Sequence, residues 1–328
     1  MEAFLPWEAE LVEKSTGEML CPWNVGAVSE AHLTAMLQSS STISAAAKVS
    51  KITEKKALGG NDEGRFGVLS CIFRISMEYE GGEGPATVIY KTTPLTADFY
   101  PLRGLCKGMR AWELEVNAYN SGLPFTNLPT CKSYFAVQDP EASRYALLLE
   151  DLNARSEGMA GGDQILGLTQ DQVSTATVVF EGAAEFHATH WNKTKAMECA
   201  KFAKETDDAF WPNVFPLMYG ATWEGFQPAL AGAGIPLDAD VKEFGDYIGT
   251  CVSDHCLWNA TTKETGGFMN STVIHCDFRL DNFFFDYAAD GSTMNVGEDG
   301  KPLWCVIDWQ LVSPATVGPC NCCFRSHF

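Results

Sequence analysis

The chain has 328 residues, of which 46% are hydrophobic and 20% charged, and its formal net charge at pH 7 is −19. Its length favours two lobes or domains, and its apolar content excludes a disordered chain. The negative charge argues against nucleic acid or an anionic membrane as a partner and favours a neutral or cationic small molecule.

The N-terminus and the cysteines bear on cellular location. Twelve cysteines would suit a secreted chain, but the segment from Met1 to Lys14 is acidic and lacks the apolar core of a signal peptide. No apolar run reaches the roughly 18 residues of a membrane span. We therefore expect a cytoplasmic protein with mostly reduced thiols.

The first regular elements form a predicted hairpin. Residues 1–58 are mixed in composition, and we interpret them as an N-terminal extension or a segment packed on the first lobe. From Phe73 to Tyr79 apolar and polar residues alternate, which is the period of a half-buried strand. A glycine-rich turn then leads to a second strand that ends at Lys91, as in an antiparallel hairpin.

A helix is predicted next, from Lys107 to Ser121, with Trp112 and Tyr119 on its buried stripe. Glu115 lies between them at helical spacing, so it points inward, and a buried carboxylate needs a cationic partner. Two further strands, at 133–137 and 145–150, complete a small antiparallel sheet, and the loop at 153–162 ends the first lobe.

The second half has a mainly helical pattern. Its clearest apolar stripe steps by three and four residues through Val173, Thr177, Phe180, Ala184, His187 and Trp191. Short strands return at 272–274, 283–285 and 304–307. A strand-rich first lobe and a helix-rich second lobe make an α+β architecture.

The strongest motif runs from His275 to Asn282 and has the spacing H-x-D-x-x-x-x-N of a kinase catalytic loop. In that pattern Asp277 accepts or orients the proton of a substrate hydroxyl, and Asn282 is a magnesium ligand. Asp308 follows a short apolar strand, where its carboxylate can be the second magnesium ligand.

Two other features complete a nucleotide site. Lys91 and Glu115 have the order of the lysine that contacts the α- and β-phosphates and the glutamate that orients it. Gly64 and Gly67 lie just before the hairpin, where a phosphate-covering loop belongs. A Walker A pattern is missing from the sequence, which argues against a P-loop NTPase.

Taken together, these blocks resemble the aminoglycoside phosphotransferase and choline kinase superfamily, nearest to its ecdysteroid-kinase-like, or CHK kinase-like, branch. The similarity extends from about Gly59 to Gly318, and six blocks in the family's order carry it: Val88–Lys91, Glu115–Tyr119, Leu147–Leu152, Glu185–Ala188, His275–Asn282 and Val306–Gln310.

The resemblance implies a protein-kinase-like bilobed fold. Residues 59–152 would be the ATP-binding lobe with an antiparallel sheet and a hinge, and residues 153–328 the helical lobe with the catalytic and metal-binding loops. It also implies ATP as phosphoryl donor, Mg²⁺, adenine held by the backbone near Glu150 and Leu152, and a small hydroxylated or aminated acceptor.

Two departures keep an alternative open. Cys276 stands where members of the family usually have glycine. After Asp308 the segment Val317–Phe324 follows only the first step of the family's Gly-Pro-Gly turn, which suggests a truncated second lobe or a diverged one. The alternative to a kinase is therefore a catalytically inactive nucleotide-binding protein.

A zinc metallohydrolase is the other enzyme class considered. His187, His190, His275 and Asp277 supply suitable side chains, but the glutamate of an H-E-x-x-H motif is missing. His187 fits better as a hydrogen-bonded core histidine.

Overall fold

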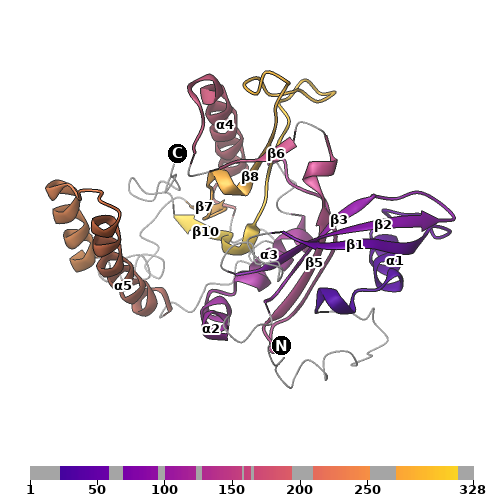
Figure 1. Ribbon diagram of the computed structural model, residues 1–328, viewed down its shortest axis with the longest axis horizontal. Coiled ribbons are helices and arrows are strands. Elements are labelled where there is room, and N and C mark those ends of the chain that lie inside the picture. Colours follow the sequence, from indigo (N-terminus) through magenta and orange to yellow (C-terminus); the bar gives the residue numbers. More distant parts are fainter. Residues whose placement is uncertain are drawn as a thin grey trace.

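The structure is a computed structural model (Figure 1). It describes residues 23–58, 69–94, 100–122, 128–156, 159–163, 166–193, 210–251 and 271–316. The α+β class is confirmed, because an antiparallel sheet dominates the first half of the chain and the long helices lie in the second. Gly64, Gly67 and the segment from Val317 onward lie outside the described residues.

One five-stranded antiparallel sheet forms the first half, in the order β1-β2-β3-β5-β4. Its strands are β1 (Lys48–Ala57), β2 (Cys71–Glu80), β3 (Thr87–Thr92), β4 (Ser133–Asp139) and β5 (Arg144–Glu150). The predicted strands match four of these. β1 extends the sheet into the segment that sequence analysis interpreted as an extension, although the division of the chain into lobes at 58 and 152 stays a prediction.

The short helix α1 (Glu30–Ser39) begins with a capping box, in which Ser29 accepts from the backbone N–H of His32 and the His32 ring accepts from that of Ser29. Its buried face, including Leu33 and Leu37, packs with apolar residues of the sheet in one hydrophobic core. Part of the segment before residue 58 is therefore a packed component of the sheet region.

Two helices connect β3 to β4, α2 (Tyr100–Met109) and α3 (Ala111–Ser121). Sequence analysis predicted one helix from Lys107, and this boundary was wrong because Arg110 adopts a left-handed conformation with φ of 55°. The predicted buried stripe is confirmed: Trp112, Glu115 and Tyr119 are all buried.

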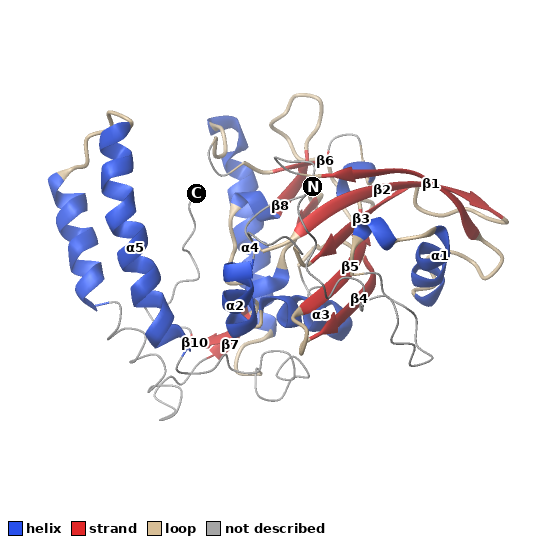
Figure 2. Cartoon of the chain, turned by 60° about the horizontal axis from the view of Figure 1, so that its bottom comes forward, coloured by secondary structure: helices blue, strands red, loops and turns tan. Residues whose placement is uncertain are grey.

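The second half carries α4 (Val173–Thr189), α5 (Phe210–Gly232) and a helical segment at 239–251. Figures 1 and 2 show α5 beside the 239–251 segment, at the end of the molecule opposite α1. Tyr219 and Trp223 of α5 donate to Gly245 O and Asp246 Oδ1, each at 2.8 Å, which holds the two helices together.

The remaining strands are short: β6 (Met159–Gly161), β7 (Ser271–Ile274), β8 (Phe283–Asp286), β9 (Trp304–Val306) and β10 (Ser313–Thr316). They form the antiparallel sets β6-β8-β9 and β10-β7. Single 3-10 turns occur at Val25–Ala27, Leu152–Ala154, Gln170–Gln172, Leu280–Asn282 and Trp309–Leu311.

The prediction of which stripe of α4 is buried was wrong, because most of the buried positions lie one residue before the predicted ones. The buried residues are Thr175, Val179, Ala183, Phe186 and His190. Val173 and Trp191, from the predicted stripe, are exposed. The buried histidine of this helix is therefore His190, whereas His187 is only partly buried.

A second hydrophobic core lies on the other face of the sheet. It joins α3 and β5 to α4, β8 and β9, so it connects the two halves of the chain. The described segments that carry the predicted site border this core, whereas Gly64 and Gly67 lie outside the described residues. Among the described residues, no helix is long and apolar enough to cross a membrane.

Candidate active site

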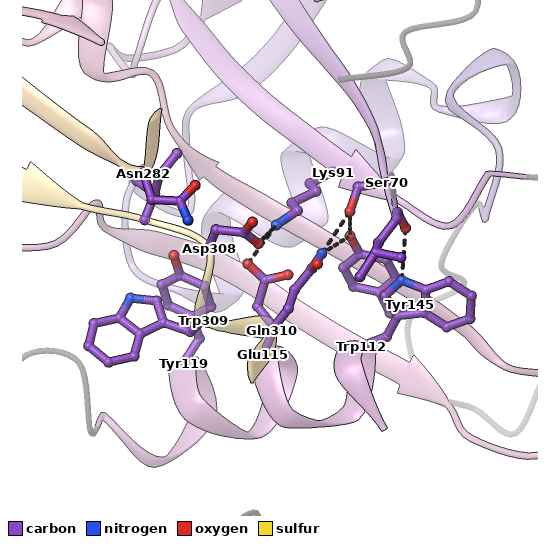
Figure 3. Close-up of polar contacts among 12 residues, drawn as sticks. Ser70, Lys91, Trp112, Glu115, Tyr119, Tyr145, Asn282, Asp308, Trp309 and Gln310 are labelled. Carbon is purple, nitrogen blue, oxygen red and sulfur yellow. Dashed lines mark hydrogen bonds and ion pairs between the residues drawn. The ribbon is translucent and has the colours of Figure 1, made fainter. Parts of the chain in front are cut away.

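Lys91 lies on the central strand β3, between Ile72 of β2 and Leu147 of β5. Its side chain is buried, and its Nζ atom is 2.8 Å from Glu115 Oε1 and 2.7 Å from Asp308 Oδ1 (Figure 3). The structure thus brings together the predicted lysine–glutamate pair from β3 and α3, and adds the predicted metal-binding aspartate to it.

The charges of this triad depend on one another. Burial alone disfavours the ammonium, but the carboxylates of Asp308 and Glu115 outweigh it and hold the pKa of Lys91 well above its ordinary value. Burial raises the pKa of Glu115, against the opposing effect of Lys91. Oε2 of Glu115 has no donor at hydrogen-bond distance among the described residues, although the nearby Gln310 amide also lowers the pKa of Glu115.

Between β7 and the 3-10 turn that precedes β8 lies the predicted catalytic loop. Asn282 donates from Nδ2 to the backbone oxygen of Asp277 at 2.8 Å and to its Oδ2 at 2.9 Å. These bonds fix the Asp277 carboxylate and leave Oδ1 of Asn282 as the free acceptor of that amide. Asp277 also forms an ion pair with Arg279, at 3.2 Å.

His275 holds this loop against the strand end that precedes Asp308. Its Nε2 lies 2.9 Å from the carbonyl oxygen of Ile307, and its Nδ1 accepts from the backbone N–H of Asp277 at 3.3 Å. A carbonyl only accepts, so the ring is the neutral Nε2–H tautomer. Burial lowers the pKa of His275, in agreement with that assignment.

Ile307 ties the two predicted metal ligands to each other. Its N–H donates to the carbonyl oxygen of Asn282 at 2.9 Å, while its own carbonyl accepts from His275. The next residue, Asp308, adopts a left-handed conformation with φ of 68°. Such a conformation costs a non-glycine residue about 1–2 kcal/mol, and here it turns the carboxylate toward Lys91.

The donor set suits magnesium. Mg²⁺ prefers oxygen ligands and is usually held by one or two carboxylates with substrate phosphates and water. Asn282 and Asp308 lie near each other in Figure 3, with the Asp308 carboxylate directed toward Lys91, and they supply an amide oxygen and a carboxylate. Among the described residues no three His, Cys, Asp or Glu side chains gather as a metal site.

The predicted hinge is held by ion pairs. Glu150 accepts from Arg155 at 2.9 and 2.5 Å and from the backbone N–H of Lys132 at 3.0 Å. Asp151 accepts from Arg74 at 2.6 and 3.1 Å, which links the hinge to β2. Leu152 is buried. The side chain of Glu150 is therefore occupied, and adenine binding by the backbone near Glu150 and Leu152 stays a prediction.

Sequence reasoning missed two residues of this region. His275 entered as the first residue of the loop motif and as a zinc ligand, without a structural role of its own. Gln310 entered only as the last residue of the block Val306–Gln310. It is buried and donates to Ser70 Oγ at 2.7 Å.

No family model and no curated protein matches the chain. Among solved structures, a thermostable mutant of aminoglycoside phosphotransferase APH(4)-Ia in its apo form matches with a TM-score of 0.31 and 12% identity, over 80% of this chain and 68% of that chain. A TM-score this low carries no argument about fold or activity, so the function is inferred from the geometry of the site.

Proposed function

We propose that the protein is an ATP-dependent phosphotransferase that phosphorylates a hydroxyl group of a small molecule. The observation that carries this proposal is the contact of Lys91 with both Glu115 and Asp308. A buried lysine on a sheet, a helix glutamate and an aspartate that follows the catalytic loop are the groups that a kinase-type site requires, in the required order.

Each of the chain's own groups has a task in this reaction. Lys91 binds the α- and β-phosphates, and Glu115 keeps its ammonium in place. The acceptor oxygen forms a bond to the γ-phosphorus of ATP while the bond from that phosphorus to the bridging oxygen breaks, so ADP leaves. Asp277 receives the hydroxyl proton. The bonds from Asn282 orient the Asp277 carboxylate before the acceptor binds.

Asn282 and Asp308 would hold Mg²⁺. The ion supplies charge neutralisation for the phosphate oxygens. Lys91 contacts Asp308 at 2.7 Å, and binding of the nucleotide phosphates by Lys91 would exchange this ion pair for contacts with phosphate.

The test is ADP release by the purified chain with Mg-ATP and a panel of amino alcohols, aminoglycosides, sugars and sterols. Asp277→Asn should lower turnover about 100-fold or more, the usual range for loss of a general base, while Mg-ATP still raises the Tm. Asp281→Asn is the matched control, because Asp281 lies in the same loop with its side chain 34% exposed. Equal turnover in Asp277→Asn and the wild type would refute the assignment.

The inactive nucleotide-binding protein remains the second candidate, and one observation favours it. The ion pair between Asp277 and Arg279 places a guanidinium on the carboxylate that should accept a proton. Under this candidate, Mg-ATP raises the Tm of the wild type and no acceptor releases ADP, whereas Arg279→Ala, which removes the guanidinium from the Asp277 carboxylate, should restore ADP release.

Finer assignments rest on the sequence. The net charge of −19 supports an acceptor that carries an amine, and it disfavours nucleic acid or a membrane surface as partner. The six sequence blocks support the CHK kinase-like branch, and use of ATP fits a cytoplasmic location.

A further inference from the structure

Gln310 lies two residues after Asp308 and is almost fully buried, with 4% of its surface exposed. Its Nε2 donates to Ser70 Oγ at 2.7 Å and lies 3.5 Å from the hydroxyl of Tyr145, which donates to the same Ser70 oxygen at 2.7 Å. Figure 3 shows this group beside Lys91 and Glu115. A buried amide that is hydrogen-bonded in this way fixes the backbone that carries it.

Three elements of the site meet at this amide. Ser70 immediately precedes β2, and Tyr145 lies on β5. Trp112 of α3 stacks on the Tyr145 ring, with the ring centroids 5.8 Å apart, and donates from Nε1 to the carbonyl oxygen of Leu69 at 3.0 Å. The start of β2 is therefore tied both to the helix that carries Glu115 and to the turn that carries Asp308.

The neighbouring side chain holds the same turn from the other side. Trp309 is fully buried, packs edge-on against His275 with ring centroids 4.7 Å apart, and donates to Thr130 Oγ1 at 3.3 Å. Trp309 thus anchors the turn to His275 and Thr130 in the core that joins the two halves, whereas Gln310 anchors it to the start of β2. Asp308, in its left-handed conformation, comes directly before these two anchors in the chain.

We propose that Gln310 is a positioning residue that holds Asp308 opposite Lys91 by fixing the Asp308 turn to the start of β2. The inference rests on the proposed function for its catalytic consequence. Without the Nε2 donor, the turn loses its tie to the start of β2 and keeps its contacts with Trp309, His275 and Asn282, so the distance between Asp308 and Lys91 is held less tightly. The Mg²⁺ concentration that the reaction requires should then rise.

Amide hydrogen exchange of the free chain tests the positioning without any turnover. Gln310→Met keeps the length of the side chain and removes the donor. Exchange should become faster in peptides covering 306–312 and 69–75 together, by roughly tenfold for one lost buried hydrogen bond. Gln138→Met is the matched control, because Gln138 donates to Asn117 of α3 at 3.0 Å, from β4. It should leave both peptides unchanged.

Kinetics give the second readout. In Gln310→Met the Mg²⁺ concentration for half-maximal rate should rise roughly tenfold at saturating ATP, with a smaller change in the KM for the acceptor, whereas Gln138→Met should match the wild type. If Gln310→Met does not fold, Ser70→Ala, which removes the shared acceptor of the Gln310 and Tyr145 hydrogen bonds, should show the same joint exchange effect.

The outcomes separate the two proposals. Unchanged exchange in both peptides, or an unchanged magnesium requirement in an active enzyme, overturns the role of Gln310. A wild type that releases no ADP, while Gln310→Met still shows the joint exchange effect, overturns the kinase proposal alone and leaves the positioning of Asp308 intact.

Discussion

Lys91 lies between two carboxylates, and removing it leaves both of them without their shared cation. Breaking a buried ion pair by deleting one partner is strongly destabilising, because the other charge stays buried and unpaired. Lys91→Met should lower the free energy of unfolding by about 3 kcal/mol. Urea denaturation of the wild type and the variant measures this difference.

The double variant tests the cause. Adding Glu115→Gln to Lys91→Met removes the orphaned charge of a fully buried residue, so it should recover most of the lost stability without restoring turnover. A double variant that is less stable than Lys91→Met alone would contradict the argument.

His190 gives the pH prediction. Burial lowers its pKa, and the neighbouring Lys193 and His187 lower it further. In the unfolded chain His190 takes up a proton near its ordinary pKa of 6.5, whereas in the folded chain it does so only at lower pH. The contribution of neutral His190 to folding stability is therefore complete above pH 6.5 and is lost as the pH falls.

The measurement compares wild type with His190→Gln. The variant loses packing against Phe186, whose ring centroid is 4.6 Å away, so it should be the less stable chain at pH 8. Since glutamine does not titrate, the difference in unfolding free energy between wild type and variant should shrink from pH 8 to pH 5. Each tenfold weakening of proton binding at His190 on folding should reduce this difference by about 1.4 kcal/mol. A difference that is constant with pH would show that His190 does not titrate in this way.

At the scale of elements, the break between α2 and α3 sets the direction of the helix that presents Glu115. Arg110 occupies this break in a left-handed conformation, which is costly for a residue with a Cβ atom and not for glycine. Arg110→Gly and Arg110→Ala both lose the ion pair with Glu113. The glycine variant should be about 1 kcal/mol more stable than the alanine variant. Equal urea midpoints for the two variants would show that the backbone at Arg110 is not strained.

The elements were predictable where one face alone is apolar. The α3 stripe and the hairpin of β2 and β3 have this pattern. The prediction fails for α4, because this helix has apolar residues on more than one face. Val173, Phe180 and Trp191 form one stripe, and Val179 and Phe186 form another. Only tertiary packing decides which stripe is buried.

β1 escaped prediction for a different reason. It is an edge strand with four lysines, at 48, 51, 55 and 56, and its residues are mostly exposed. Charge on an edge strand limits pairing with other chains, but it removes the alternation by which a strand is recognised.

For the site, motif order sufficed to select Lys91, Glu115, Asp277, Asn282 and Asp308, because each lies at the end or on the buried stripe of a recognisable element. The hydrogen bonds that hold these residues in place could not be predicted from the sequence. Gln310 and Ser70 are 240 positions apart, and neither stands in a local pattern that points to the other. Long-range partners of buried polar residues follow from the packed structure alone.

At the scale of the whole molecule, two cores on opposite faces of one sheet place the site where the halves of the chain meet. Lys91 comes from the sheet, whereas the Asp277 loop and Asp308 come from the second half. Any change in the relation of the halves therefore changes the distance between Lys91 and Asp308. The hydrogen bond from Gln310 of the second half to Ser70 of the first is one contact between the halves that lies beside the site.

The net charge of −19 also acts at this scale. A negative field raises the local concentration of cations, and salt screens it over a Debye length of about 10 Å at 0.1 M. For an amine-bearing acceptor, the KM should therefore rise several-fold between about 20 and 200 mM NaCl. A neutral sugar or sterol acceptor should show no such change, and Mg-ATP is kept saturating so that screening of the nucleotide does not contribute. If an active amine acceptor has a KM that is independent of salt, the field of the protein plays no part in its selection, and acceptor specificity arises from contacts within the pocket alone.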